Sequence, residues 1–257
     1  MSDNPTYDAK AFRVLCERED RHFWFRARNR VIGAVLDRVE PRLHPPYRVV
    51  EIGCGTGNTL RTVERVCHRG DVIGMDLFSE GLALARQRVR CQLIQADVHH
   101  LQENEAYDMV CLFDVLEHLD DDAAILQAIH RILKPGGLLI LTVPALASLW
   151  SYFDEWSCHR RRYERVDLNR RLVEAGFMVE QLSFFMSLLL PLAYLTRRRR
   201  GGATAASPTR EELEHEFRII PVLNSLLDAL LRFEAPRLGR GRSLPWGTSL
   251  LGVARKI

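Results

Sequence analysis

Short runs of apolar residues recur along the chain, and most of them end in a polar or glycine-rich stretch. Runs of this length, without strict alternation of polar and apolar residues, are typical of strands that are buried on both faces of a parallel sheet. Between several runs, apolar residues recur at helical spacing. The pattern predicts an α/β protein whose strands lie at residues 49–52, 71–77, 92–97, 107–113, 138–143, 177–184 and 249–255.

Two regions depart from the alternation of strands and helices. Residues 1–46 predict a helical N-terminal lid, with a helix over about 8–39 for which an interruption is left open. Residues 185–247 predict a helical insert, because the last strand begins about sixty residues later than a short connection would require. Residues 47–184 then form the core, and residues 248–257 add its final strand.

Composition narrows the class of protein. The hydrophobic content of 47% supports a full core, and the net charge of +3 is too small to indicate nucleic-acid binding. The six cysteines include no C-x-x-C pair and no metal-ligand spacing with histidine. The polar first residues lack an apolar signal core, so we expect a cytoplasmic protein.

A glycine-rich loop follows the first predicted strand. Glu51 lies in the apolar run, and glycines then occupy alternate positions, namely Gly53, Gly55 and Gly57. A helix over about 58–66 would turn its unpaired backbone N–H groups toward a ligand above the strand. A dinucleotide site requires G-x-G-x-x-G/A, but Asn58 occupies the third position here. A nucleotide-binding oxidoreductase is therefore disfavoured, although it stays an alternative together with a non-catalytic cofactor-binding protein.

Acidic residues close the next two predicted strands, with Asp76 after the second and Asp97 after the third. The fourth strand leads into Asp114-Val-Leu-Glu-His-Leu, which contains His118. Aspartate is also common in turns, but open α/β sheets bind ligands at the carboxyl ends of their strands. We therefore expect Asp76 and Asp97 to contact a cofactor.

In this order, the motifs resemble those of class I S-adenosylmethionine-dependent methyltransferases, of the small-molecule type found in quinone biosynthesis. The resemblance implies a Rossmann-like, seven-stranded, mostly parallel sheet with helices on both faces and an antiparallel last strand. It implies S-adenosylmethionine as cofactor, with Glu51 near the methionine moiety, Asp76 near the ribose and Asp97 near the adenine. The expected cofactor contacts are Glu51, Gly53, Cys54, Gly55, Gly57, Asn58, Asp76, Leu77, Asp97, Val98, Phe113, Asp114 and His118.

The N-terminal segment places three aromatic residues among arginines. Trp24 and Arg28 lie four residues apart, on one face of a helix. One interpretation is an amphipathic helix that packs its aromatic side chains on the sheet edge. The other is a lid over the cofactor, in which the Arg28 guanidinium pairs with the methionine carboxylate.

A second resemblance to the quinone-biosynthetic methyltransferases lies after the fifth strand. There Asp154 precedes His159, Arg161, Arg162 and Tyr163, and the resemblance assigns these five residues to the substrate. His159 is the favoured catalytic base, because its pKa is ordinarily near neutrality, and His118 is the second choice or a structural residue. The arginines are also consistent with a solvated surface.

The acceptor is expected to be a small molecule, a lipid, or a lipid-linked or saccharide compound. O-methylation is favoured, although nitrogen and carbon acceptors stay open. Asp120, Asp121 and Asp122 suggest a metal site at first, but a helix N-terminus explains their negative charge better. The sequence therefore predicts no metal.

The insert has two apolar segments with arginine-rich flanks, at residues 186–200 and 219–242, joined by a predicted flexible loop at 201–208. The first segment is shorter than the roughly twenty apolar residues that a membrane span needs. The insert is a helical cap over the site, a peripheral membrane contact with arginines against anionic head groups, or both, since the two are not exclusive. The second alternative would place the protein at the inner face of the membrane.

Overall fold

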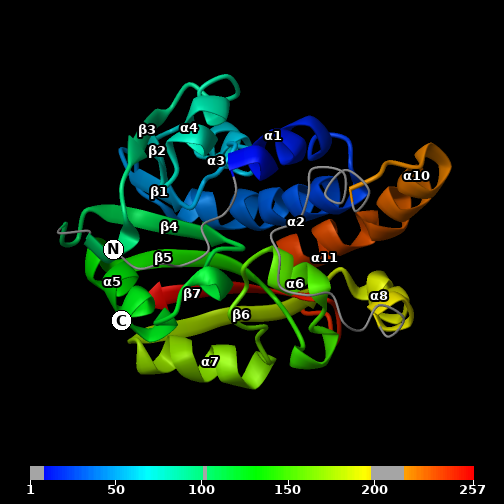
Figure 1. The fold of residues 1–257 in the computed structure, drawn as a ribbon. Helices are drawn as coiled ribbons and strands as arrows, with labels where there is room; N and C mark the ends of the chain where they lie inside the picture. The colour runs from blue at the N-terminus through cyan, green and yellow to red at the C-terminus, as the bar shows by residue number, and fades with distance from the viewer. Residues whose placement is uncertain (1–8, 101–102, 198–216) are drawn as a thin grey trace.

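A computed structural model of the 257-residue chain describes residues 9–100, 103–197 and 217–257 (Figure 1). Its seven-stranded sheet has the order β3-β2-β1-β4-β5-β7-β6. Strand β7 pairs antiparallel with both β5 and β6, whereas the pairs among β1 to β5 are parallel. The predicted sheet and its antiparallel last strand are therefore confirmed. The strands are β1 (Arg48–Ile52), β2 (Asp71–Asp76), β3 (Gln92–Gln95), β4 (Tyr107–Phe113), β5 (Leu133–Pro144), β6 (Phe177–Phe185) and β7 (Ser249–Lys256).

Helices connect and cover these strands. The helix that was expected over about 8–39 is two helices, with a break at residues 19–22, and the helix expected from residue 58 begins at Leu60. The α-helices in the described ranges are α1 (Ala9–Arg18), α2 (Phe23–Val39), α3 (Leu60–Val66), α4 (Ser79–Ala85), α5 (Asp122–Ile132), α6 (Tyr152–Trp156), α7 (Arg165–Glu174), α8 (Leu190–Arg197), α10 (Pro221–Leu230) and α11 (Glu234–Gly239).

Both faces of the sheet are covered, as the apolar runs predict. Side chains alternate between the faces along a strand, so Met109 of β4 belongs to one apolar cluster and Val110 to the other. Helices α2, α3 and α11 pack in the first cluster, and α5 and α7 pack in the second. Figure 1 shows the two helical layers on opposite sides of the strands. The core therefore lies on both sides of the central strands.

Strand β5 begins earlier than the strand predicted at 138–143. Helix α5 ends at Ile132, and β5 begins at Leu133, so the strand includes Lys134-Pro-Gly-Gly. Leu133 already pairs with Tyr107 of β4, and the register shifts between Tyr107 and Met109. The irregular proline–glycine segment is therefore accommodated inside a long strand, because pairing with β4 continues on both sides of it.

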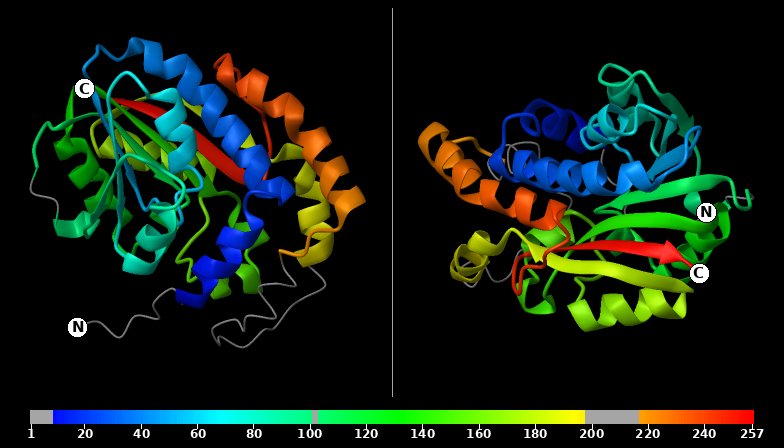
Figure 2. Two further views of the ribbon diagram at one scale, coloured as in Figure 1. Left: turned by 90° about the horizontal axis from the view of Figure 1, so that it is seen from above. Right: turned by 180° about the vertical axis from the view of Figure 1, so that it is seen from behind.

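Helices α8, α10 and α11 lie together at one end of the sheet. Helix α11 packs on α2, so this part of the predicted insert shares the core cluster of the N-terminal helix. Figure 2 shows α8, α10 and α11 at the same end of the sheet in two further directions. The basic run after Arg197 and the predicted loop at 201–208 lie outside the described residues. The division into lid, core and insert stays a prediction.

Every helix in the described ranges is too short or too polar to traverse a bilayer.

Candidate active site

A cavity of about 1040 Å³ lies where β1, β2, β3 and β4 end. This volume lies just above the roughly 300–1,000 Å³ that small-molecule sites occupy. One part of the wall is formed by the glycine loop and the residues after β2 and β3, and the other part holds His118 and His159. The carboxyl ends of the strands thus form the site, as predicted for an open α/β sheet.

The glycine loop has a backbone that side chains would not allow. Gly53 has φ +72°, and a Cβ atom there would lie 2.3 Å from a methyl carbon of Val115. Gly57 has φ +80°, and its Cβ would lie 3.1 Å from Ala85 of α4. Gly53 and Gly55 line the cavity, whereas Gly57 is not among the described residues of its wall. Gly57 therefore allows the turn and the packing on α4, and its predicted contact with the cofactor stays a prediction.

Asp76 joins the end of β2 to the glycine loop. Its carboxylate accepts hydrogen bonds from the backbone N–H groups of Gly55 at 2.7 Å and Phe78 at 2.9 Å. Burial raises the pKa of Asp76, while these N–H donors favour its ionised form. Asp97 follows β3 and also lines the cavity, as predicted. The two carboxyl groups thus mark the ends of adjacent strands, where polar groups of a ligand would be bound.

Glu51 lies one step behind the cavity wall and is buried. One of its carboxyl oxygens accepts a hydrogen bond from the Thr59 hydroxyl, and the other has no partner among the described residues. Burial raises the pKa of Glu51 to about 8, so its carboxyl group favours the neutral acid near neutral pH. A cationic group of a ligand would shift Glu51 toward the carboxylate. Its predicted contact with the methionine moiety stays a prediction.

Arg28 connects the N-terminal helix α2 to the end of β4. Nη1 of its guanidinium lies 2.7 Å from Oδ2 of Asp114. The guanidinium carbon Cζ lies over the Trp24 ring, 5.0 Å from the ring centroid. The second oxygen of Asp114 accepts a hydrogen bond from Thr142 at 3.1 Å. Trp24, Arg28 and Asp114 all line the cavity. Helix α2 therefore covers the site, and its arginine is in place to pair with a carboxylate.

Helix α1 also covers the glycine loop, which the sequence did not predict in detail. Glu19, just after this helix, accepts hydrogen bonds from the Thr56 hydroxyl in the loop and from Arg88. The Phe12 ring lies 5.8 Å from the Phe78 ring, and both line the cavity. The sequence did not indicate these contacts, because Glu19 is far along the chain from Thr56 and Arg88, and Phe12 is far from Phe78.

The other part of the cavity contains two histidines. The rings of His118 and His159 meet edge to face, with their centroids 4.8 Å apart. Nδ1 of His159 lies 2.9 Å from Oδ1 of Asp154, which is fully buried. Asp154 also accepts a hydrogen bond from Nε of Arg162 at 2.7 Å. Burial lowers the pKa of His118 to about 3, so this ring is neutral. Asp154 therefore orients His159 and leaves its Nε2 for other contacts.

The remaining residues assigned to the substrate lie behind the wall. Tyr163 donates a hydrogen bond to Asp122 at 2.8 Å, and the Arg161 guanidinium also lies 2.8 Å from Asp122. Among the described residues of the wall, His159 is the member of the predicted substrate set. The contacts of Asp154, Arg161, Arg162 and Tyr163 favour a supporting role, and their predicted contact with the acceptor stays a prediction.

The run Asp120–Asp122 is at a helix N-terminus, as the sequence indicates. Asp121 caps α5 by accepting a hydrogen bond from the N–H of Ala124 at 2.9 Å. Asp122 is buried, and it pairs with arginines from the neighbouring segments. This explains the charges of the run without a ligand.

A family profile described as "Methyltransferase domain" matches residues 23–182 of the chain. The chain belongs to this family. The prediction of a class I S-adenosylmethionine-dependent methyltransferase, with that cofactor, is therefore confirmed at the level of the family.

The relatives of this family member are methyltransferases. It is 27% identical to the malonyl-[acyl-carrier protein] O-methyltransferase of Halorhodospira halophila over 70% of this chain and 66% of the relative. It is 30% identical to a probable S-adenosylmethionine-dependent methyltransferase of Mycolicibacterium smegmatis over 63% of this chain and 62% of the relative. The chain thus spans less than two thirds of the length of these relatives.

A solved structure shares the fold over nearly the whole of this family member. It is a methyltransferase of Haloferax volcanii in complex with the Trm112 methyltransferase activator, and 99% of this chain superposes on 97% of that chain. The TM-score is 0.63 and the sequence identity is 20%. At this identity the similarity concerns the fold alone.

The apolar part of the wall in this methyltransferase-family chain includes residues of the segment that the sequence offered as a cap, although the sequence did not name the side chains. It comes from α6, from the segment around α8 and from the turn before α10, through Phe153, Leu189, Leu192, Ala193 and Phe217. These residues belong to segments without a shared motif, so only their convergence in space identifies them. They give the acceptor part of the cavity an apolar lining.

Proposed function

We propose that this protein transfers the methyl group of S-adenosylmethionine to a hydroxyl group of a small-molecule or lipid-linked acceptor. The observation that carries the proposal is the division of one cavity into two parts. The cofactor part has the glycine loop, Asp76 and Asp97, and the acceptor part has His118, His159 and apolar side chains. A methyl donor and its acceptor would meet between them.

The cofactor supplies a methyl group that its sulfonium already activates. The task of the protein is then to align the acceptor with the carbon–sulfur bond and to exclude water. Helices α1 and α2 cover the cofactor part, and Arg28 with Trp24 forms its lid. Asp154 holds Nδ1 of His159. Nε2 of His159 can therefore take the proton from an acceptor hydroxyl in the acceptor part of the cavity.

A hydroxyl acceptor is favoured over nitrogen and carbon acceptors by two observations. The His159–Asp154 pair suits removal of a hydroxyl proton, which an amine acceptor would not require. In addition, the relative from Halorhodospira halophila is an O-methyltransferase, which supports an oxygen acceptor without distinguishing a hydroxyl from a carboxyl group. The apolar wall around Leu189 and Leu192 supports an acceptor with an apolar portion.

The proposal is tested with S-adenosylmethionine that carries a labelled methyl group. The purified chain is incubated with polar and lipid fractions of a bacterial extract, and mass spectrometry follows the label. We expect label in an oxygen-linked methyl group of a small or lipid-linked product, and less label with the Asp76→Ala variant at a limiting cofactor concentration. Tight NAD binding without S-adenosylmethionine binding would instead support the oxidoreductase, and cofactor binding without any product would support a non-catalytic protein.

We propose further that the protein contacts an anionic membrane surface through α8 and α10. Most of the large apolar side chains that the described residues expose lie here, namely Leu188, Leu192, Tyr194, Leu195, Ile220, Val222, Leu223, Leu226, Leu230 and Phe233. Val222 is 82% exposed and Leu226 is 55% exposed. Exposed apolar groups clustered at one end are typical of an interaction site.

The polar side of α10 faces the protein, which explains why its apolar side is exposed. Asp228 is 2% exposed, and it pairs with Arg30 at 2.7 Å, Arg26 at 3.3 Å and Arg232 at 3.4 Å. Asn224 accepts a hydrogen bond from the N–H of Phe23 at 2.8 Å. The helix is therefore oriented by polar contacts with the start of α2. The partly exposed arginines add positive charge, which favours anionic head groups.

Changing Leu223 and Leu226 together to glutamate is expected to release the protein from anionic vesicles. Burying one leucine side chain in an apolar environment contributes about 1.5–3 kcal/mol to the free energy of binding. Losing part of this contribution at two positions should therefore weaken vesicle binding by about tenfold or more. Co-sedimentation with phosphatidylglycerol-containing vesicles measures this at low and high salt.

The matched control is Val166→Glu with Val173→Glu on α7, which exposes apolar side chains away from α8 and α10. This control should bind vesicles like the unchanged protein. A protein that remains in the supernatant with both anionic and neutral vesicles would contradict the membrane contact, and α8 and α10 would then act as a cap.

A further inference from the structure

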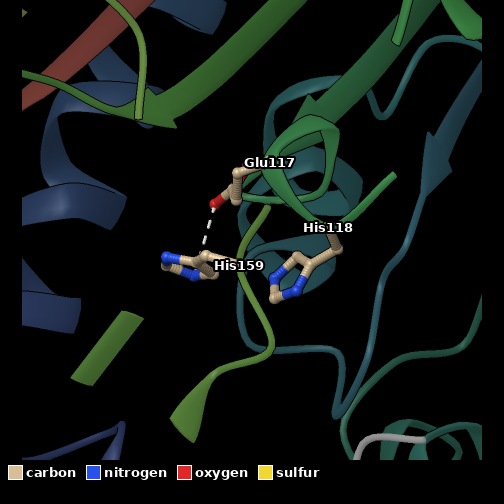
Figure 3. A group of neighbouring side chains, drawn as sticks. All are labelled: Glu117, His118 and His159. Atoms are coloured by element: carbon tan, nitrogen blue, oxygen red, sulfur yellow. Dashed lines mark ion pairs between the residues drawn. The ribbon is translucent and has the colours of Figure 1, made fainter. Parts of the chain in front are cut away.

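Three potential metal ligands gather beside the acceptor part of the cavity, where His118 and His159 line the wall and Glu117 is buried behind it. Glu117 and His118 belong to the short 3-10 turn Leu116–His118 after β4, and His159 comes from the loop between α6 and α7. One ligand atom of each residue lies within 4.8 Å of the others (Figure 3). The cluster therefore joins two segments that the fold brings together.

Glu117 is the unusual member of this cluster. It is 1% exposed, and neither of its carboxyl oxygens has a hydrogen-bond partner among the described residues. Its Oε1 lies 4.0 Å from Nε2 of His159, which is too long for a hydrogen bond. A buried carboxyl group without a partner is unfavourable unless it is neutral or lies beside a cation.

We propose that Glu117, His118 and His159 bind a divalent first-row cation, for which zinc is the best-suited member. Two imidazoles and one carboxylate form a known donor set for zinc, with a fourth position left for a water molecule or a substrate oxygen. Metal–ligand bonds of about 2.0–2.2 Å would require Glu117 and His159 to approach each other by less than about 1 Å.

An outer contact orients His159 for this role. Nδ1 of His159 lies 2.9 Å from Asp154, which leaves Nε2 toward Glu117. The ring of His118 meets the His159 ring edge to face, with the centroids 4.8 Å apart. Metal-binding histidines almost always have a carboxylate or a backbone carbonyl as their second partner. The surroundings of the cluster thus match a metal site beyond the three ligands themselves.

The site would open into the cavity, because His118 and His159 both line its wall. A cation there would lie beside the acceptor and would lower the pKa of a bound hydroxyl group. This consequence rests on the proposed methyl transfer, and Nε2 of His159 would then be a ligand instead of the base. Binding of the cation itself does not depend on the reaction.

The test is calorimetric titration of the full chain with zinc chloride after treatment with a chelator, and cobalt absorption spectra as a second readout. We expect one cation per chain, with affinity lower by at least about tenfold in Glu117→Gln and in His159→Gln. Glu155→Gln and His100→Gln are matched controls, because both side chains are exposed outside the cluster. Circular dichroism checks that each variant folds, and His118→Gln replaces a variant that does not.

Absence of zinc and cobalt binding by the full chain would overturn the proposal, and so would equal binding by the two ligand variants. If neither metal binds, Glu117 is a neutral acid that is buried behind the cavity wall. Binding of S-adenosylmethionine is measured on the same samples, because its loss in every sample would contradict the proposed function without bearing on the cation. A cation that binds while methyl transfer is absent would support the site alone.

Discussion

Replacing His159 by alanine is expected to lower turnover by about a hundredfold to ten-thousandfold, the range that general acid–base catalysis contributes. The affinity for S-adenosylmethionine should stay nearly unchanged. The physical reason is the position of His159 in the acceptor part of the cavity, where Asp154 holds its Nδ1. A group that takes the acceptor proton acts only after both molecules are bound. Steady-state kinetics with the acceptor, together with calorimetry for the cofactor, measures the two effects separately.

His44→Ala is the matched control for this prediction, since the His44 side chain is exposed and is not among the described residues of the cavity wall. It should retain the turnover of the unchanged protein. A parallel loss of cofactor affinity in His159→Ala would place the histidine in the cofactor shell. Unchanged turnover would show that the acceptor needs no base here.

The loss of turnover alone does not separate a base from a metal ligand. If His159 is only a base, zinc should not stimulate the chelated enzyme, and Glu117→Gln should have a smaller effect than His159→Ala. If both residues hold a cation, both variants should lose cation binding and turnover together. Comparing the two variants with and without added zinc therefore assigns the role of His159.

Replacing Asp76 by alanine is expected to weaken S-adenosylmethionine binding by about tenfold to a hundredfold. A hydrogen bond to a charged group contributes about 1.5–3 kcal/mol, which corresponds to this range. Asp76 also accepts the N–H of Gly55, so its loss would loosen the glycine loop in addition. Calorimetric titration measures the change. Asp71→Ala at the exposed beginning of the same strand is the control and should bind normally.

Gly55→Val gives a second view of the same site. Gly55 has φ +51°, a conformation that a β-branched side chain rarely adopts, and its Cβ would lie on the cavity side near Phe12. Gly136→Val carries a similar strain at φ +76°, with no atom within 4 Å of its Cβ. Weak binding in the Gly55 variant with normal binding in the Gly136 variant is the expected result. Unchanged affinity in both Asp76→Ala and Gly55→Val would remove the assignment of the cofactor site.

Much of the cofactor part could be predicted, because its signals are local. The apolar runs predict strands that are buried on both faces of a sheet. The G-x-G-x-G loop predicts a backbone conformation that only glycine adopts easily. Asp76 and Asp97 follow from their places at strand ends, since parallel strands share one edge. Even here, Gly57 and Glu51 are set back from the wall, because a motif specifies spacing and not which atoms reach the cavity.

The acceptor part of the cavity could not be predicted in the same way, because it is formed by contacts between segments that are distant in the chain. Arg161, Arg162 and Tyr163 lie within four residues of His159, yet they pair with Asp122 and Asp154 instead of facing the cavity. The buried carboxylates Asp122 and Asp154 must be paired, and this requirement decides the direction of the Arg161 and Arg162 side chains. Asp122 lies in a distant part of the chain. The sequence predicted no metal site for the same reason, because Glu117 and His159 meet only in the folded chain.

The amino-acid sequence by itself thus determined the sheet, the glycine loop and the carboxylates at the strand ends, since these depend on neighbours along the chain. Only the tertiary structure decided which side of α10 faces outward. The sequence left its apolar side either packed in a cap or in contact with a membrane, and Asp228 and Asn224 turn the polar side inward. Pairing a buried carboxylate with the arginines of α2 is specific to this packing, whereas apolar contact can be made with many surfaces.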